Sequence, residues 1–333
     1  MSVLSFGTMT VGGRDRFSKM GNLQVADTER VLDICMEAGV TTVDTADVYS
    51  FGGAEEVLGQ ALKGRRDRLV LVSKVFQRMS PAPHDTGLSR KHIIEACDAS
   101  LRRLQTDYLD LYISHEPDVL VPIEETMRAF DDLVKAGKVR YVGCSNHAAW
   151  QVMKALAVSD REHITRYICQ QVNYSLLARD VEHDIIPLAL DQGCGLMAWS
   201  PLQAGLLTGK FRRDRKPESS RTLDLGVPGT IDYERLYRIV DVMVAIADAR
   251  GVSVSQVGLN WLINKPGVDT VVIGARDEAQ LRDNLAVATW SLTAEEMKRL
   301  DDVSELPEPY PQWHQHKFGL ERNPRIPARR LRD

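Results

Sequence analysis

The segment Tyr108–Ser114, YLDLYIS, is an apolar run that ends directly at His115. A helical pattern precedes it and begins after Ser89. The apolar side chains of that pattern fall at the spacing of one helix face: Ile93, Ile94, Cys97, Leu101 and Leu104. A helix that leads into a short buried strand is the unit of a parallel α/β fold, so this stretch predicts the architecture of the whole chain.

Four other apolar runs also end at polar or aromatic residues. They are 41–43 before Asp44 (with Tyr49 five residues later), 69–73 before Lys74, 139–144 before Ser145-Asn146, and 195–198 before Trp199-Ser200. In a parallel α/β barrel the catalytic residues lie at the C-terminal ends of several strands. The layout therefore predicts one active site assembled from many strands.

Strand-like and helical patterns alternate along the chain. The expected strands are 3–8, 41–44, 69–75, 108–114, 139–144, 167–172, 194–199 and 269–273. The expected helices between them are 25–38, 54–63, 89–105, 122–136, 147–157, 180–192 and 254–264. Eight strands with helical crossovers over roughly 250 residues predict a TIM (β/α)8 barrel. A doubly wound sheet is the second alternative, but Gly7–Gly13 after the first strand lacks its G-x-G-x-x-G turn.

The barrel is expected to form a single domain over residues 1–333, with its core at about 3–290 and a C-terminal helix and tail at about 291–333. Two segments exceed what a barrel needs. The first is a long loop at 200–234 with an extra helix at 235–250, and long loops of this kind usually cover or bind ligands. The second is a long C-terminal loop at 305–333, which follows a helix at 293–303 that Thr293 caps with Glu296 at N3.

The composition argues against several classes of protein. The formal net charge is −4 and no long basic tract occurs, so a nucleic-acid partner is not expected. Five scattered cysteines without a CxxC motif indicate buried thiols in a reducing compartment. The first residues lack the pattern of a signal peptide, and no apolar run approaches the ~20 residues of a membrane helix. We expect a cytoplasmic protein without a membrane partner.

The polar strand ends suit the reduction of a carbonyl group. A phenol such as Tyr49 has a pKa of about 10, and a nearby ammonium such as Lys74 lowers it. Asp44 would keep that lysine charged, and the imidazole of His115 can orient a substrate oxygen. Such a set needs a hydride source, which implies a nicotinamide. Each residue alone has an ordinary structural explanation, so the prediction depends on their occurring together. The competing metal hydrolysis lacks support, because the one HxH, at 314–316, lies in the tail.

The chain contains, in this order, the motifs VDTADVY (43–49), GGAEEVLG (52–59), GLSRKHI (87–93) with SLRRLQTDYLDLYISH (100–115), VGCSN (142–146), QVNY (171–174), WSPLQAGLLTGK (199–210) and IGARDEAQLRDN (273–284). These motifs and their order resemble those of the aldo-keto reductase superfamily. Within it, the chain is most similar to the bacterial branch related to potassium-channel β-subunits and glycerol or sugar aldehyde reductases. The likeness covers about residues 5–303.

The resemblance implies a barrel that binds NADP(H), with NAD(H) as the alternative. It assigns Tyr49 as proton donor, Asp44 and Lys74 as its tuners, and His115 as the residue that orients the carbonyl. Ser145, Asn146 and Gln171 would bind the carboxamide, and Trp199 would stack on the nicotinamide. The remaining implied cofactor contacts are Gly7, Thr8, Met9, Ser200, Leu202, Gly205, Lys210, Arg221, Gly274, Arg276, Gln280 and Asn284. Arginine suits phosphate binding, which favours NADPH over NADH.

Three departures from the family pattern concern the barrel ends. The chain starts almost at its first strand, without the family's usual initial hairpin. Glu116 stands where the branch commonly has arginine, at the barrel mouth. Trp313 lies where the family places its substrate-covering loop, so it is expected to be either a substrate wall or a packing residue.

The sequence thus predicts an NADP-dependent carbonyl reductase or alcohol dehydrogenase acting on small carbonyl or alcohol substrates. The alternative is an NADP(H)-binding regulatory subunit with vestigial catalysis. The sequence does not name the physiological substrate, and it leaves a homo-oligomer open.

Overall fold

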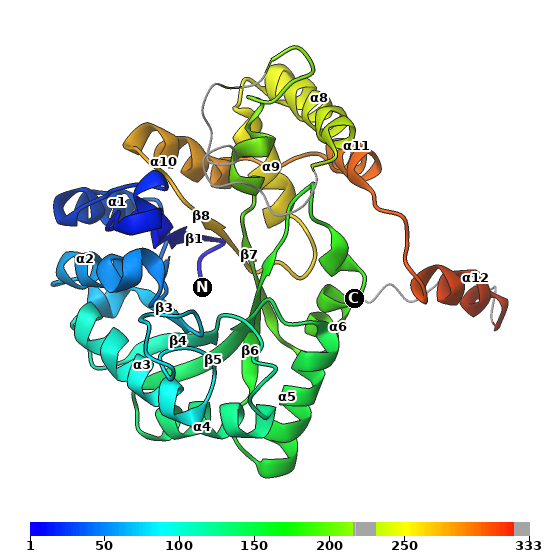
Figure 1. Cartoon of the computed structure of the whole chain (residues 1–333). Coiled ribbons are helices and arrows are strands. Elements are labelled where there is room, and N and C mark those ends of the chain that lie inside the picture. The colour runs from blue at the N-terminus through cyan, green and yellow to red at the C-terminus, as the bar shows by residue number, and fades with distance from the viewer. Residues whose placement is uncertain (216, 218–230, 323–333) are drawn as a thin grey trace.

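The computed structural model describes residues 1–215, 217 and 231–322. Its strands are β1 (Leu4–Gly7), β2 (Thr42–Asp44), β3 (Val70–Val75), β4 (Leu109–Ser114), β5 (Val139–Ser145), β6 (Tyr167–Asn173), β7 (Gly195–Trp199) and β8 (Thr270–Ile273). They pair in parallel in sequence order, and β8 closes onto β1 (Figure 1). The predicted TIM barrel is confirmed, with each expected strand within one residue of its observed ends.

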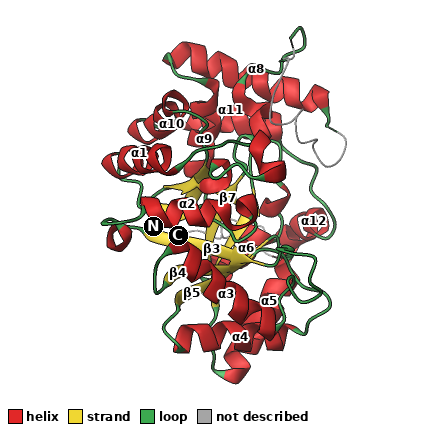
Figure 2. Ribbon diagram, turned by 60° about the vertical axis from the view of Figure 1, so that its left-hand side comes forward, coloured by secondary structure: helices red, strands yellow, loops and turns green. Residues whose placement is uncertain are grey.

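Helices surround the strands on all sides (Figure 2). They are α1 (Val25–Glu37), α2 (Gly53–Ala61), α3 (Arg90–Leu104), α4 (Ile123–Lys135), α5 (Ala149–Glu162), α6 (Ile185–Gln192), α8 (Tyr233–Arg250), α9 (Val254–Ile263), α10 (Glu278–Leu285), α11 (Ala294–Ser304) and α12 (Gln312–Arg322). The expected helix at 180–192 is split into a 3-10 turn at Asp180–Glu182 and α6. Helices α10 and α12 were not expected, because their sequences show no continuous apolar stripe.

The expected cap of the helix at 293–303 is confirmed. The backbone N–H of Glu296 donates to Thr293 Oγ1 at 3.2 Å, and the Thr293 N–H donates to Glu296 Oε2 at 2.7 Å. This reciprocal capping box satisfies two backbone donors that the first turn of a helix leaves free. Ser89 likewise caps α3 by accepting from the His92 N–H at 3.3 Å.

The barrel interior changes from apolar to polar along the strands. Its apolar layer consists of Val72, Leu111, Ile113, Cys169 and Met197. Because side chains on one strand face alternate with a period of two, Lys74 follows Val72 on the same inward face, one step nearer the C-terminal end. Ser73 between them points outward, where its hydroxyl donates to the buried Glu55 carboxylate at 2.6 Å.

All five cysteines are free and buried. Burial holds the pKa of the Cys144 thiol well above its ordinary value and raises the pKa of the Cys35 thiol to about 12. These thiols therefore stay protonated and unreactive, in agreement with the expected buried cysteines.

Across the described part of the chain, no single helix has the length and apolar character needed to span a bilayer; only α8 and α9 taken together, bent by 101°, meet that test. Helix α12 lies apart from the barrel, on the side of the molecule where α6 packs (Figure 1). Gln312 Nε2, at the start of α12, donates a hydrogen bond to the His183 carbonyl, just before α6, at 3.1 Å.

Candidate active site

A cavity of about 860 Å³ opens at the C-terminal ends of the strands. Each of the eight strands, or the loop directly after it, contributes to its wall. The predicted residues that line it are Gly7, Met9, Asp44, Tyr49, His115, Glu116, Ser145, Asn146, Gln171, Trp199, Ser200, Leu202, Gly205, Lys210, Gly274, Arg276, Gln280 and Asn284. The structure thus brings residues from most of the chain's length to one site, as the strand-end pattern predicts.

Lys74 lies beneath this cavity and connects two of the predicted catalytic residues. Its ammonium donates to Asp44 Oδ2 at 2.7 Å, to the Thr45 carbonyl at 2.8 Å and to the Tyr49 hydroxyl oxygen at 3.3 Å. Three acceptors use all three N–H groups of an ammonium, so the position of Nζ is fixed. Because the chain turns after β2, the Tyr49 hydroxyl and the Asp44 carboxylate contact the same ammonium.

Lys74 is fully buried, yet its charge is stabilised. Burial alone lowers the pKa of an amine, but the Asp44 carboxylate and the Tyr49 phenol outweigh that effect and leave the pKa of Lys74 raised. The site therefore keeps a permanent positive charge next to the phenolic oxygen.

His115 faces Tyr49 edge-on, with 6.1 Å between the ring centroids. Burial, together with the nearby Lys74 ammonium, lowers the pKa of His115 from 6.5 to about 3. The ring is therefore neutral at physiological pH. Its Nδ1 atom is buried with no hydrogen-bond partner among the described residues. A neutral imidazole carries one N–H, which can donate to a carbonyl oxygen.

The lowered pKa of His115 predicts a pH-dependent stability. As the pH falls from 6.5 towards 3, the unfolded chain takes up a proton at this residue and the folded chain does not. The free energy of unfolding therefore decreases. Between pH 7 and pH 5 the free energy of unfolding of the wild-type protein should fall by about 2 kcal/mol more than that of a His115→Asn variant. Urea unfolding of both proteins at the two pH values measures this difference. Equal losses in the two proteins would contradict it.

Gln171 and Ser145 fit the amide group of a nicotinamide. Gln171 is buried and donates through Nε2 to Asp44 Oδ1 at 2.7 Å, which leaves its own Oε1 free to accept. Ser145 Oγ is buried with no partner among the described residues. A carboxamide has one acceptor oxygen and two N–H donors, so a hydroxyl and an amide oxygen complement it.

Asn146 uses its side chain within the protein. Its Nδ2 donates to the His115 carbonyl and to Glu116 Oε1, both at 3.0 Å, and its Oδ1 accepts from Trp199 Nε1 at 3.2 Å. The expected carboxamide contact therefore has only the remaining lone pair of Oδ1 available. The indole that would stack on the nicotinamide is itself tied to Asn146.

The far end of the cavity carries cations and exposed polar groups. Lys210 and Arg276 are exposed, and their side chains form no ion pair within the described residues. The backbone N–H of Arg276 donates to Gln280 Oε1 at 2.9 Å, and Asn284 Nδ2 donates to the Gly274 carbonyl at 3.2 Å. These bonds fix the loop between β8 and α10 that places Arg276 at the cavity.

Three expected contacts are not among the lining residues. Thr8 is fully buried, and its hydroxyl donates to the Asp44 carbonyl at 3.2 Å, so it supports β2 instead of facing the cavity. Trp313 lies on the projecting α12, where it packs against Tyr310 and His314 with 46% of its surface exposed. The expected substrate wall is therefore not formed by Trp313 in this structure. Arg221 lies outside the described residues.

One wall of the cavity was not predicted from the sequence. Arg16, Phe17 and Met20, from the segment between β1 and α1, line it together with Val48 and Gln77. Phe17 is buried against Tyr49 and Phe51, with ring centroids 6.1 and 6.0 Å away. An aromatic residue beside arginine in a long loop was the available signal, but loop side chains do not follow a period that places them.

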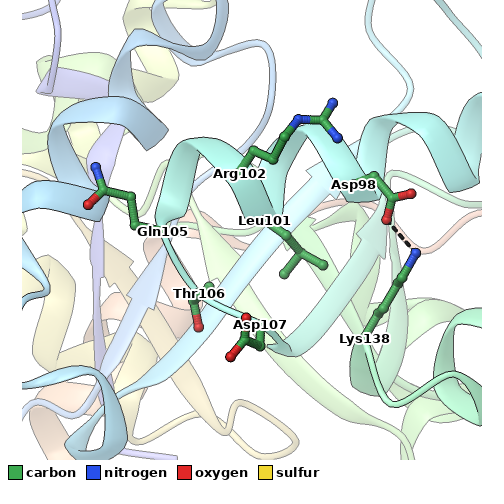
Figure 3. Close-up of a pocket in the computed structure, with 7 residues that line it drawn as sticks. All are labelled: Asp98, Leu101, Arg102, Gln105, Thr106, Asp107 and Lys138. Atoms are coloured by element: carbon green, nitrogen blue, oxygen red, sulfur yellow. Dashed lines mark hydrogen bonds and ion pairs between the residues drawn. The ribbon is translucent and has the colours of Figure 1, made fainter.

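A second hollow lies at the opposite end of the barrel, beside the last turn of α3 (Figure 3). Its lining residues are Asp98, Leu101, Arg102, Gln105, Thr106, Asp107 and Lys138. Lys138 pairs with Asp98 at 2.6 Å and immediately precedes β5, so this hollow opens at the N-terminal strand ends. No predicted site residue lies there.

The described residues contain no group of three His, Cys, Asp or Glu side chains that could hold a metal ion. In the HxH sequence of the tail, His316 Nδ1 lies 2.7 Å from Glu308 Oε1. His316, on α12, therefore forms a surface pair with Glu308.

Comparison with known proteins agrees with this geometry. A profile of the Aldo/keto reductase family matches residues 3–305. A probable voltage-gated potassium channel subunit beta of Arabidopsis thaliana is 37% identical, covering 86% of this chain and 87% of its own length. Versiconal hemiacetal acetate reductase of Aspergillus parasiticus is 34% identical, covering 79% and 82%. Aldo-keto reductase YhdN of Bacillus subtilis is 32% identical, covering 91% and 90%.

The match extends over nearly the whole chain, and the barrel brings the matching motifs to one cavity. The chain therefore belongs to the aldo/keto reductase family, a family of oxidoreductases.

Proposed function

We propose that the protein reduces aldehydes and ketones to alcohols with NADPH as the hydride donor, in a reversible reaction. The observation that carries this proposal is the Lys74 ammonium, which binds the Asp44 carboxylate and the Tyr49 hydroxyl at the floor of the cavity.

The residues would act on the substrate oxygen. When bound, the nicotinamide supplies a hydride to the carbonyl carbon. The neutral His115 donates a hydrogen bond to the carbonyl oxygen and orients it. Tyr49 transfers its hydroxyl proton to that oxygen as the C–H bond forms, and the alcohol leaves. The Lys74 ammonium stabilises the negative charge that remains on the phenolic oxygen.

The same cavity supports the cofactor assignment. Ser145 Oγ and Gln171 Oε1 offer a donor and an acceptor for the carboxamide at one end. Lys210 and Arg276 provide two cations at the other end. Cations suit the pyrophosphate and a 2′-phosphate, which only NADP(H) carries.

Arg276→Ala tests the preference for NADPH. Loss of a charge-assisted contact to the 2′-phosphate should raise the KM for NADPH by about tenfold and leave the KM for NADH within about twofold. The matched control is Arg282→Ala, because Arg282 is exposed on α10, pairs with Glu278 at 2.8 Å and does not line the cavity. Equal changes for both cofactors would refute the 2′-phosphate contact.

The direct test of the function is NADPH and NADH oxidation at 340 nm against a panel of aliphatic aldehydes, aromatic aldehydes, ketones and quinones. We expect turnover with NADPH on at least one class. Tight NADPH binding without turnover on the whole panel would instead favour a regulatory subunit, the alternative that the similarity to potassium channel β-subunits supports.

We further propose that the protein works in the cytoplasm on small-molecule substrates, without a nucleic-acid or membrane partner. The support is the set of five buried free thiols and the near-neutral charge. A homo-oligomer is compatible with these features.

A further inference from the structure

A hydrogen-bonded chain of three side chains crosses the cavity wall from β7 to the loop after β4. The indole N–H of Trp199 donates to Asn146 Oδ1 at 3.2 Å, and Asn146 Nδ2 donates to Glu116 Oε1 at 3.0 Å. All three residues line the cavity. The position of the Trp199 indole thus depends on Asn146, and the orientation of the Asn146 amide depends on Glu116.

The chemistry of the two ends fixes the amide orientation of Asn146. An indole N–H can only donate, so it requires the amide oxygen. The His115 carbonyl and the Glu116 carboxylate can only accept, so they require the amide nitrogen. A flipped amide would face a donor with its NH2 group and two acceptors with its oxygen.

The backbone of Asn146 contributes to this arrangement. Its φ is +60°, in the left-handed region that asparagine tolerates better than most residues. Its N–H donates to the Gln171 carbonyl at 3.3 Å. This bond fixes the main chain of Asn146 between β5 and β6. The hydrogen bond to Glu116 then limits the rotation of the Asn146 side-chain amide.

Glu116 is half-buried and is turned towards Asn146. Among the described residues no cation lies within 4.0 Å of its carboxylate, which accepts a hydrogen bond from Asn146 Nδ2. The half-buried Glu116 carboxylate is therefore hydrogen-bonded within the protein before any substrate binds.

We propose that Glu116 is a positioning residue for the nicotinamide ring: it orients Asn146, which in turn holds the indole of Trp199 against the cofactor. This inference rests on the proposed nicotinamide cofactor, and it replaces the expected role of Glu116 as a substrate contact. Without the carboxylate, Asn146 Nδ2 loses one acceptor and the indole loses a fixed anchor. The effect falls on the nicotinamide end and not on the adenosine end.

The experiment measures dissociation constants by quenching of protein fluorescence, with NADPH, NADH and 2′,5′-ADP as probes. Glu116→Ala should raise the Kd of NADPH and of NADH by the same factor, about tenfold, because the Asn146 amide is then no longer held in place before binding and must be ordered when the cofactor binds. The Kd of 2′,5′-ADP, which lacks the nicotinamide, should stay unchanged. Glu116→Gln keeps an acceptor oxygen and should stay within about threefold of the wild type.

Two further variants sharpen the test. Glu295→Ala removes an exposed carboxylate in the first turn of α11, outside the cavity, and it should leave the Kd of NADPH unchanged. Asn146→Asp places a carboxylate against Glu116 and should weaken NADPH binding, whereas the double variant Asn146→Asp/Glu116→Gln exchanges donor and acceptor and should recover part of the loss. This pair keeps the proposal testable if Glu116→Ala does not fold.

Several results would overturn the proposal. One is an unchanged NADPH Kd in Glu116→Ala with only the carbonyl KM altered, which would make Glu116 a substrate contact. Another is an equal loss for 2′,5′-ADP, which would place the effect outside the nicotinamide end. Absence of NADPH binding by the wild type would overturn this inference and the proposed function together. Normal binding without any carbonyl turnover would overturn only the proposed function.

Discussion

Tyr49→Phe is expected to lower the kcat of carbonyl reduction by about 10³-fold. The substitution removes the hydroxyl that lies 3.3 Å from the Lys74 ammonium and leaves the ring and its packing against Phe17 in place. Without the hydroxyl, the substrate oxygen loses its proton donor and keeps the hydrogen bond from His115. The measurement is steady-state NADPH oxidation with the best substrate of the panel.

The loss should appear in kcat and not in cofactor binding. The Kd of NADPH should stay within about twofold, because the phenolic hydroxyl lies on the substrate side of the carboxamide contacts proposed for Ser145 and Gln171. Tyr141→Phe is the matched control, since Tyr141 is an exposed tyrosine near the start of β5. Turnover by Tyr49→Phe equal to that of the control would rule out Tyr49 as the proton donor.

The sequence predicts the barrel because each strand has its own local signal. An apolar run such as Tyr108–Ser114 indicates a buried strand, and parallel strands that follow one another with helical crossovers have few ways to pair. The position of His115 at the C-terminal end of such a run then places it on the functional face of the barrel. Strand boundaries and strand-end residues were therefore predictable together.

The loops lack such a rule. Arg16 and Phe17 line the cavity because Phe17 packs on Tyr49 and Phe51, and contacts between residues more than thirty positions apart leave no periodic trace in one sequence. Of the two expectations for Trp313, the substrate wall is not formed in this structure, for a related reason. Its place in the chain suggested a covering loop, but the segment forms α12 and stands away from the barrel.

Hydrogen-bond partners were the least predictable part of the site. The family resemblance implied that Asn146 and Gln171 bind the carboxamide, and both line the cavity. In the structure each also bonds an acidic side chain, Glu116 and Asp44 respectively, and these partners come from the loop after β4 and from β2. A residue type at a strand end indicates what it can bind, whereas side chains from other parts of the barrel decide which of its atoms remain available.

Lys74→Met is expected to have the largest effect on stability. It should lower the free energy of unfolding by about 3–5 kcal/mol, because it leaves the Asp44 carboxylate buried without its counter-ion. Asp44 is 2% exposed and Lys74 is 0% exposed, so water cannot replace the missing charge. Urea unfolding followed by circular dichroism measures the loss, and carbonyl reduction should disappear with it.

A double variant separates the cost of an unpaired charge from the loss of packing. In Asp44→Asn/Lys74→Met no charge of the pair remains, and the new amide can still accept from Gln171 Nε2, which now donates to Asp44 Oδ1 at 2.7 Å. The double variant should recover about 2 kcal/mol or more of the stability lost in Lys74→Met, while catalysis stays absent. A double variant that is less stable than Lys74→Met would contradict this account, since the two losses would then add as independent packing defects. Recovery of stability without recovery of activity would mean that the buried pair serves the chemistry of Tyr49, because a neutral pair of similar size can fill the same space.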